Sequence, residues 1–311
     1  MQHQILVQAV RRRKRLRSYQ KSLLLMLIPG LIFFAVYKYY PMYGVLIAFK
    51  NFRIKKGIVG SPWANPLFKN FYTFFKSPYC AQVLTNTVTI SLMKLVFSTF
   101  ACIALAVLLS EVRNLKFKRF VQTTTYLPHF LSWVIIYGML YAIVSESSGL
   151  INVMIRASGR KTIPILTSTK LFQPMLVVTE IWKNAGWGAI VYLAAIAGID
   201  PGLYEAAEID GATRLQRVWH VTLACIRPTI IMLLILKLGN ILDAGFDQIY
   251  NLYNTQVYEV ADIIDTWVYR TGLEQMSYET ATAVGLFKSA IGTVLVVLVN
   301  TLARRWDESL W

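Results

Sequence analysis

Six apolar runs dominate this chain, and each is long enough to cross a lipid bilayer as a helix. They extend over residues 22–49, 85–110, 120–144, 171–199, 229–249 and 281–303. A spanning helix needs about 20 apolar residues, because every backbone polar group must find its partner within the segment. Charged residues make up only 15% of the chain, whereas soluble domains carry about 25%. The sequence therefore predicts an all-α integral membrane protein with six transmembrane helices.

The first run is longer than one span requires, and it contains Pro29, Gly30, Pro41 and Gly44. Proline removes a helical hydrogen bond and its ring collides with the preceding turn. We therefore expect this first helix to be broken or kinked.

Lysine and arginine predict the orientation, because short basic loops stay on the cytoplasmic side of a membrane. If the N-terminus lies inside, the outer segments are longer and carry fewer basic residues than the inner ones. This places both termini and the segment 201–228 in the cytoplasm, and it relates the net charge of +16 to topology and anionic lipid rather than to nucleic acid. The basic residues of the short inner segments are Arg11, Arg12, Arg13, Lys14, Arg15, Arg17, Lys21, Arg113, Lys116, Lys118, Arg119, Arg214, Arg217, Arg227, Arg304 and Arg305.

The expected organisation is one membrane domain with short tails. Residues 1–21 form a basic cytoplasmic segment, 22–303 the six-helix domain and 304–311 a cytoplasmic tail. A cleavable signal peptide is not expected, because the first apolar run is too long and no small-residue cleavage pattern follows it.

Side chains suited to catalysis or metal binding are scattered rather than clustered. The cysteines have no metal spacing, and the G-x-x-x-x-G-K-[ST] phosphate loop is absent from the sequence. We therefore expect neither an enzyme nor a bound cofactor in this chain. The scattered residues are Cys80, Cys102, Cys225, His3, His129 and His220.

The polar segment 201–228, which lies between two apolar runs, has a pattern typical of a docking element. Ala206 and Ala207 allow another backbone to approach closely, and Gly211 can end a helix in the left-handed conformation. The segment, expected to form two short helices, resembles the EAA loop, the cytoplasmic coupling helix of importer-type ABC permeases. An ordinary amphipathic helix at the membrane surface is the alternative. The matching residues are Glu205, Ala206, Ala207, Asp210, Gly211, Ala212, Trp219, Val221 and Pro228, with Ala224 standing where that family usually has proline.

Short matches in the same order along the chain extend this resemblance to the carbohydrate-uptake permeases, in particular those named for lipoprotein or polysaccharide transport. Each match is weak alone, but their order is specific. They include Tyr40, Pro41, Gly44, Asn70, Asn86, Tyr126, Pro128, Trp182, Gly186, Trp187, Gly245, Asp247, Tyr258, Asp265, Gly285 and Lys288.

The resemblance implies the six-helix fold of a type I ABC importer permease in a bacterial cytoplasmic membrane. Glu205, Ala206, Ala207, Asp210 and Gly211 would couple it to a separate ATPase that holds ATP and Mg²⁺. The implied partners are two ATPase subunits, a second permease that is usually a different chain, an extracytoplasmic solute-binding protein and an oligosaccharide. Transport would proceed by alternating access.

Polar residues within the apolar runs are candidates for the substrate pathway, because ionisable groups in a membrane usually face a cavity or a partner. Trp182, Lys183, Asn184 and Trp187 form one set, in which the tryptophans could stack on sugar rings or instead form an interfacial belt. Asp247 and Gln248 form a second set, for which sugar contact and helix–helix hydrogen bonding remain equally open.

Other intramembrane charges are Lys38, Lys94, Glu180, Lys237, Asp243 and Lys288. We expect an ion pair at Lys288 and favour Lys183 as the pathway cation. The excess of lysine over acid would suit an acidic oligosaccharide, but the surplus lysines could equally snorkel or pair with acids on the partner permease. The acidic outer segment 250–279 could dock a binding protein or form a solvated helical cap.

Three other functions remain as alternatives. The first is an ABC importer permease for peptide, phosphate or amino acid. The second is an ion-coupled secondary transporter, against which the absence of a clear internal repeat argues. The third, a membrane-bound enzyme, would need a clustered catalytic set that the sequence lacks.

Overall fold

The computed structural model describes residues 18–304, which are helical apart from connecting loops and one isolated bridge between Lys50 and Trp63. Nearly all of the expected basic segment 1–21 and of the tail 304–311 lies outside the described residues. The chain divides into two compact units, 1–46 and 47–311, which are described separately.

The first unit is a helix that changes type along its length. It comprises α1 (Ser18–Phe34), the π-helical η1 (Ala35–Tyr39), α2 (Tyr40–Met42) and the beginning of the 3₁₀-helix η2 (Tyr43–Phe49). Leu23–Phe49 remains a single candidate span of 27 residues, so the expected break is wrong, whereas the expected kink stays a prediction. The wider π turn ends at Tyr39, two residues before Pro41, and includes Tyr37, whose carbonyl an α-helical turn would place against the proline ring.

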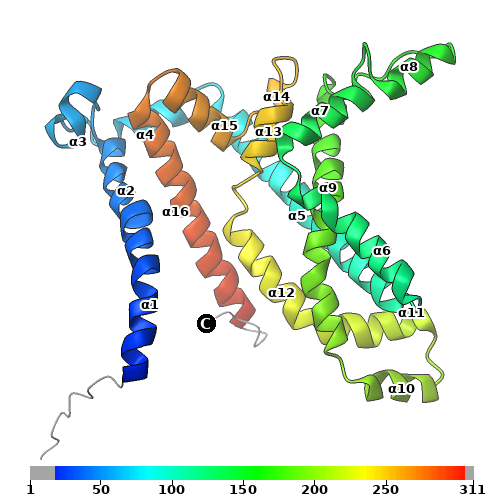
Figure 1. The fold of residues 1–311 in the computed structure, drawn as a ribbon. Coiled ribbons are helices and arrows are strands. Elements are labelled where there is room, and N and C mark those ends of the chain that lie inside the picture. The colour runs from blue at the N-terminus through cyan, green and yellow to red at the C-terminus, as the bar shows by residue number, and fades with distance from the viewer. Residues whose placement is uncertain (1–17, 305–311) are drawn as a thin grey trace, which may run out of the picture. The chain divides into compact units, whose positions relative to one another are not determined.

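Long helices form the second unit (Figure 1). They are α5 (Cys80–Glu111), α9 (Thr169–Ala197), α12 (Leu223–Gly239) and α16 (Tyr278–Ala303). The most extensive packing joins α5 to α9, and α12 packs on α16. Small residues allow the close approach, since a Cβ at Gly188 of α9 would lie 2.5 Å from the Cys102 sulfur of α5.

The third predicted run is not a straight helix. It begins within α6 (Leu115–Tyr126), passes through η4 (Leu127–Phe130) and resumes as α7 (Trp133–Val144), with a bend of 106°. Pro128 lies in the turn, and the Ser132 hydroxyl accepts a hydrogen bond from the Ile135 amide as α7 begins. The described chain thus has four helices long and apolar enough to span a membrane, or six if each bent pair is one span.

The predicted bounds of the fifth run are wrong. The helix that crosses begins as α11 (Arg214–Arg217), continues through η5 (Val218–Thr222) and ends with α12 at Gly239. A capping box between Thr213 and Gln216 starts it. The second half of the polar segment 201–228 is therefore the beginning of a long helix, and only its first half is a separate short helix, α10 (Pro201–Ile209).

Short elements gather at the end of the second unit opposite α10 (Figure 1). The chain leaves α12 through residues 240–245, where Gly245 has a positive φ of 89°. We call this end the outer end, after the orientation predicted from the sequence. Its elements include α4 (Lys69–Phe75), α8 (Leu150–Ala157), α13 (Phe246–Leu252), α14 (Tyr258–Ala261), α15 (Ile264–Tyr269) and η6 (Arg270–Glu274).

Candidate functional site

The short helix α10 is defined at both ends by local signals. Asp200 accepts a hydrogen bond from the Gly202 amide at 2.9 Å, and Pro201 occupies the first turn. At the other end Gly211 has φ 76°, and the Ala212 amide donates to the Ala207 carbonyl at 2.9 Å. These are the features of a Schellman cap, so the prediction of a left-handed Gly211 is confirmed.

The surface of α10 combines charge with exposed apolar side chains. Glu205 and Ala206 are exposed and Ala207 is half-buried, while Ile209 is 86% exposed. Glu205 is the fifth residue of α10, beyond the first turn, so the helix macrodipole contributes little to the stability of its carboxylate. An exposed apolar side chain beside an unburied carboxylate is suited to contact another protein.

Two contacts join α10 to the helix that follows. Glu208 pairs with Arg217 at 2.9 Å, and the Tyr204 hydroxyl lies 3.0 Å from the hydroxyl of Thr222. Asp210 lies exposed at the cap. The predicted coupling residues are therefore on one short element linked to a long helix, an arrangement that could transmit displacement.

Lys183 of α9 occupies a different environment from the one predicted. Its side chain is buried, and Nζ donates to the carbonyl oxygens of His129 at 2.7 Å and Leu131, with Pro128 at 3.4 Å. The ammonium also lies 5.6 Å from the Trp133 ring. Lys183 thus holds the carbonyls freed by the 106° bend, and this structural role competes with the pathway role, which stays a prediction.

The other residues of this predicted set surround the same bend. Asn184 donates to Glu180 at 2.7 Å, and its carbonyl oxygen lies 2.8 Å from His129 Nδ1. Trp187 stacks on the His129 ring with centroids 4.6 Å apart. Trp182 is 47% exposed on α9. The structure therefore brings Asn184 and Trp187 together with His129, which the sequence analysis did not select.

Asp247 and Gln248 separate into two environments on α13. Asp247 is exposed, whereas Gln248 is fully buried and donates to the Leu176 carbonyl and the Thr179 hydroxyl, both at 2.8 Å. Helix–helix hydrogen bonding is thus observed for Gln248. A sugar contact at Asp247 remains a prediction.

Four of the intramembrane charges converge on one cavity of about 380 Å³, the inner cavity. Lys94 donates to the Ala244 carbonyl at 2.6 Å, and Lys237 donates to Thr99 at 3.1 Å. Gly245 forms part of the wall, and a Cβ there would collide with the Lys94 ammonium. The charged lining residues are Lys94, Glu180, Lys237 and Asp243.

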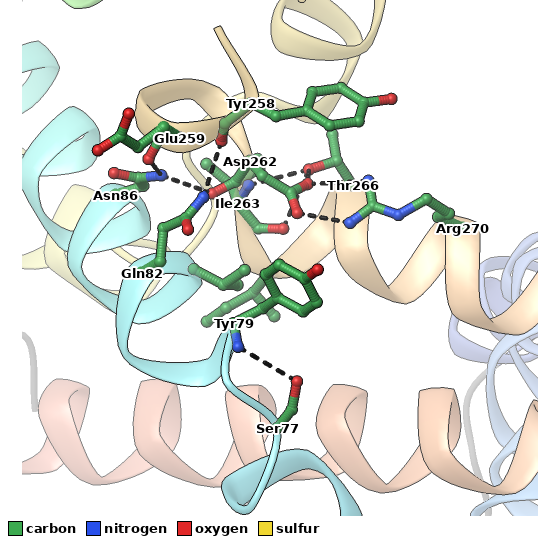
Figure 2. A network of polar contacts seen from close by, with 12 residues as sticks. Ser77, Tyr79, Gln82, Asn86, Tyr258, Glu259, Asp262, Ile263, Thr266 and Arg270 are labelled. Carbon is green, nitrogen blue, oxygen red and sulfur yellow. Dashed lines mark hydrogen bonds and ion pairs between the residues drawn. The ribbon is translucent and has the colours of Figure 1, made fainter. Parts of the chain in front are cut away.

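Long-range polar contacts hold the outer end, as Figure 2 shows. The Asn86 amide of α5 donates to the carbonyls of Glu259 at 2.9 Å and Asp262 at 3.1 Å. Asp262 accepts from Thr266 at 2.8 Å and pairs with Arg270. Burial alone would lower the pKa of Arg270. The hydrogen bonds and the charge of Asp262 raise it by more, so the pKa of Arg270 lies above its usual value.

Lys288 forms the expected ion pair. Its Nζ lies 2.6 Å from an oxygen of Asp265, a residue of α15. Burial raises the pKa of Asp265, and Lys288 opposes that shift. Asp262 and Asp265 are therefore internal partners of cations. For the acidic segment 250–279 as a whole, docking of a binding protein and a solvated helical cap both stay predictions.

Comparison with known proteins gives consistent matches. The family model described as "Binding-protein-dependent transport system inner membrane component" matches residues 98–308. A polygalacturonan/rhamnogalacturonan transport system permease protein of Bacillus subtilis strain 168, YteP, is 45% identical over 93% of this chain and 89% of its own length. Protein LplB of the same strain is 44% identical over 93% and 90%.

Solved structures also match. A chain of a bacterial ABC transporter involved in import of the acidic polysaccharide alginate superposes with a TM-score of 0.85 and 40% identity, covering 92% of this chain and 96% of that one. A second structure, an alginate ABC transporter in complex with a periplasmic protein carrying an alginate pentasaccharide, gives 0.84 and 40%, covering 94% and 96%.

Proposed function

Because this chain belongs to the family of binding-protein-dependent transport system inner membrane components, we propose that it is the permease subunit of an ATP-driven oligosaccharide importer. It forms half of the translocation pore and performs no covalent chemistry. The observation that carries this proposal is the exposed, capped helix α10, which presents Glu205 at one end of the bundle. Such an element has a role in a transporter driven by a separate ATPase subunit and none in an ion-coupled carrier.

The substrate we favour is an oligosaccharide that contains uronic acids. A relative at 45% identity is named for polygalacturonan and rhamnogalacturonan transport, and the structural match at 40% is named for alginate. The excess of lysines does not support this choice, because Lys183 is held by carbonyls and Lys288 by Asp265. The preference therefore rests on the relatives.

We expect one α10 to serve one ATPase, which would hold ATP and Mg²⁺. Two ATPases acting together need a second permease, and a heterodimer of different chains is the proposed form. A solute-binding protein would deliver the sugar at the outer end, consistent with the periplasmic protein in the alginate complex. Closure of the ATPases would move α10, and the long helix that begins at Arg214 would carry this motion into the helix bundle.

The proposed orientation places α10 and both termini in the cytoplasm. Labelling of single cysteines with an impermeant maleimide tests this in a Cys225→Ser background, since Cys80 and Cys102 are buried. In sealed, right-side-out vesicles, Gln256→Cys should react, and Asp210→Cys should react only after permeabilisation. Reaction of Asp210→Cys in sealed vesicles would refute the orientation.

Uptake by the reconstituted transporter tests the function. The chain would be assembled with its partner permease, ATPase and binding protein in proteoliposomes and supplied with tri- and pentagalacturonate. ATP-dependent accumulation of the galacturonides, but not of a peptide or phosphate, is expected. Uptake of peptide, phosphate or amino acid without galacturonides would favour the alternative importer.

A further inference from the structure

Aromatic side chains follow one face of α13 and continue just beyond it. Phe246 and Tyr250 are four residues apart in α13 and therefore lie on one helical face, and Tyr253 is the extended residue that directly follows the helix. The Phe246 and Tyr250 rings are 5.2 Å apart and nearly parallel, and those of Tyr250 and Tyr253 are 6.0 Å apart. Tyr269 lies 4.8 Å from Tyr250 at its side.

This aromatic face is distinct from the side of α13 that packs in the core. Gln248, Ile249 and Leu252 are buried, with exposures of 2% or less. Tyr250 is 36% exposed, and Phe246 and Tyr253 are half-buried. The aromatic rings therefore have accessible surface along the helix.

A cavity lies at each end of the aromatic face. The inner cavity is lined by Gly245, the residue before α13. A second cavity of about 610 Å³, the outer cavity, is lined by Tyr253, Asn254 and Gln256, with Tyr137, Tyr141 and Arg156 from α7 and α8. Since α13 has seven residues, the two are separated by about 10 Å of helix.

The outer cavity has the chemistry to bind a carbohydrate. Tyrosine rings pack against the apolar C–H faces of pyranoses, while amide side chains hydrogen-bond to hydroxyls. Arg156 donates to the Glu146 carbonyl at 3.1 Å, and because a guanidinium has five donors, others remain for a sugar carboxylate. Burial and a hydrogen bond with Tyr258 raise the pKa of Tyr253 above its ordinary value.

The inner cavity has an unfilled hydrogen-bonding group. Ser91 is buried and lines this cavity, and its hydroxyl has no partner within the described part of the chain. A buried hydroxyl without a partner is costly. Its oxygen has less than 1 Å² of exposed surface, so a sugar hydroxyl could supply the missing bond only after a movement of the cavity wall.

We propose that Phe246, Tyr250 and Tyr253 form an aromatic track along which an oligosaccharide passes, ring by ring, from the outer cavity to the inner cavity. The inference rests on the proposed oligosaccharide import and names a binding surface for it. Stacking on an aromatic ring depends little on which sugar unit is bound, and here it is distributed over several rings. A sugar chain can therefore slide without being held at one strong site.

Substitution of Tyr250 tests the track in the assembled transporter. With pentagalacturonate as the probe, Tyr250→Leu should raise the KM for uptake by roughly fivefold, which is the scale of one lost aromatic contact. The effect should be smaller for trigalacturonate, which covers fewer rings, and Tyr250→Phe should retain uptake. Tyr79→Leu is the matched control, because Tyr79 is 58% exposed and belongs neither to the aromatic face nor to the lining of either cavity.

The competing occupant of this face is the second permease. If Tyr250→Leu reduced copurification of the partner permease, the face would be a subunit contact and the track would be refuted. Unchanged uptake kinetics in Tyr250→Leu would also refute it. Failure of the unsubstituted transporter to take up either galacturonide would instead overturn the proposed function, and the track with it.

Discussion

The two ends of the second unit are built in different ways. At the α10 end the polar side-chain contacts join residues close in sequence, from Asp200 with Gly202, two apart, to Tyr204 with Thr222, 18 apart. At the outer end Asn86 contacts Asp262 from 176 residues away, and the Thr87 hydroxyl accepts from the Ile264 amide across 177. One end is a local, exposed element, and the other requires the whole bundle to be folded.

This difference suits two mechanical tasks. A helix held by caps and a few surface contacts can be displaced as a unit without disturbing the core. An end held by buried, long-range hydrogen bonds resists displacement and keeps its cavity walls in place. If this account is right, equivalent substitutions should cost much more stability at the outer end than at the α10 end.

The largest expected loss of stability comes from Asp262→Ala. It leaves the partly buried Arg270 without its carboxylate and removes the acceptor of Thr266, and breaking such a buried pair costs about 3–5 kcal/mol. The matched control is Asp210→Ala, an exposed aspartate at the end of α10, where a change under about 0.5 kcal/mol is expected. Thermal unfolding in detergent, followed by size-exclusion chromatography, measures both, and equal Tm values for the two variants would contradict the comparison.

The next largest effect is expected from Lys183→Met. The carbonyls of Pro128, His129 and Leu131 would lose a common donor, at a cost of about 2–3 kcal/mol in unfolding free energy. Lys76→Met, on an exposed lysine, is the control. A Lys183→Met protein of normal Tm with impaired uptake of galacturonides would instead support the pathway role first predicted for this residue.

A smaller loss is expected from Gly211→Ala at the α10 end. No atom lies within 4 Å of the added Cβ, so the cost is only the left-handed backbone at φ 76°, about 1–2 kcal/mol. Gly211→Asn should lose less, because asparagine tolerates this conformation. If Gly211→Ala had the same Tm as the unsubstituted protein, a side chain would not strain the backbone at this position, and the prediction would be wrong.

The same contrast explains what could be predicted from the sequence. The left-handed Gly211 and the short helix before it follow from signals within a few residues, and the structure contains both. The partners of Lys183, Lys94 and Asp262 come from other helices, and a single sequence does not say which helices meet. The fifth helix was misplaced for a related reason, since the capping box at Thr213 competes with an apolar run that begins later.

The partners of the intramembrane lysines are the hardest feature to predict, and the errors share one cause. Intramembrane lysines are readily interpreted as binding groups for a substrate. Lys183 and Lys94 instead donate hydrogen bonds to backbone carbonyls where helices bend or end. Proline and glycine near such lysines, as with Pro128 and Gly245, are the available signal, because a break frees carbonyls that need donors.

The central claim is that α10 couples this permease to an ATPase, and Glu205→Lys tests it most directly. Glu205 is exposed on α10, so reversal of its charge should leave Tm and assembly unchanged. The measurement is ATP hydrolysis by the complete transporter in proteoliposomes, with and without sugar-loaded binding protein. The account predicts that Glu205→Lys abolishes the stimulation, whereas full stimulation in a normally assembled Glu205→Lys complex would contradict it.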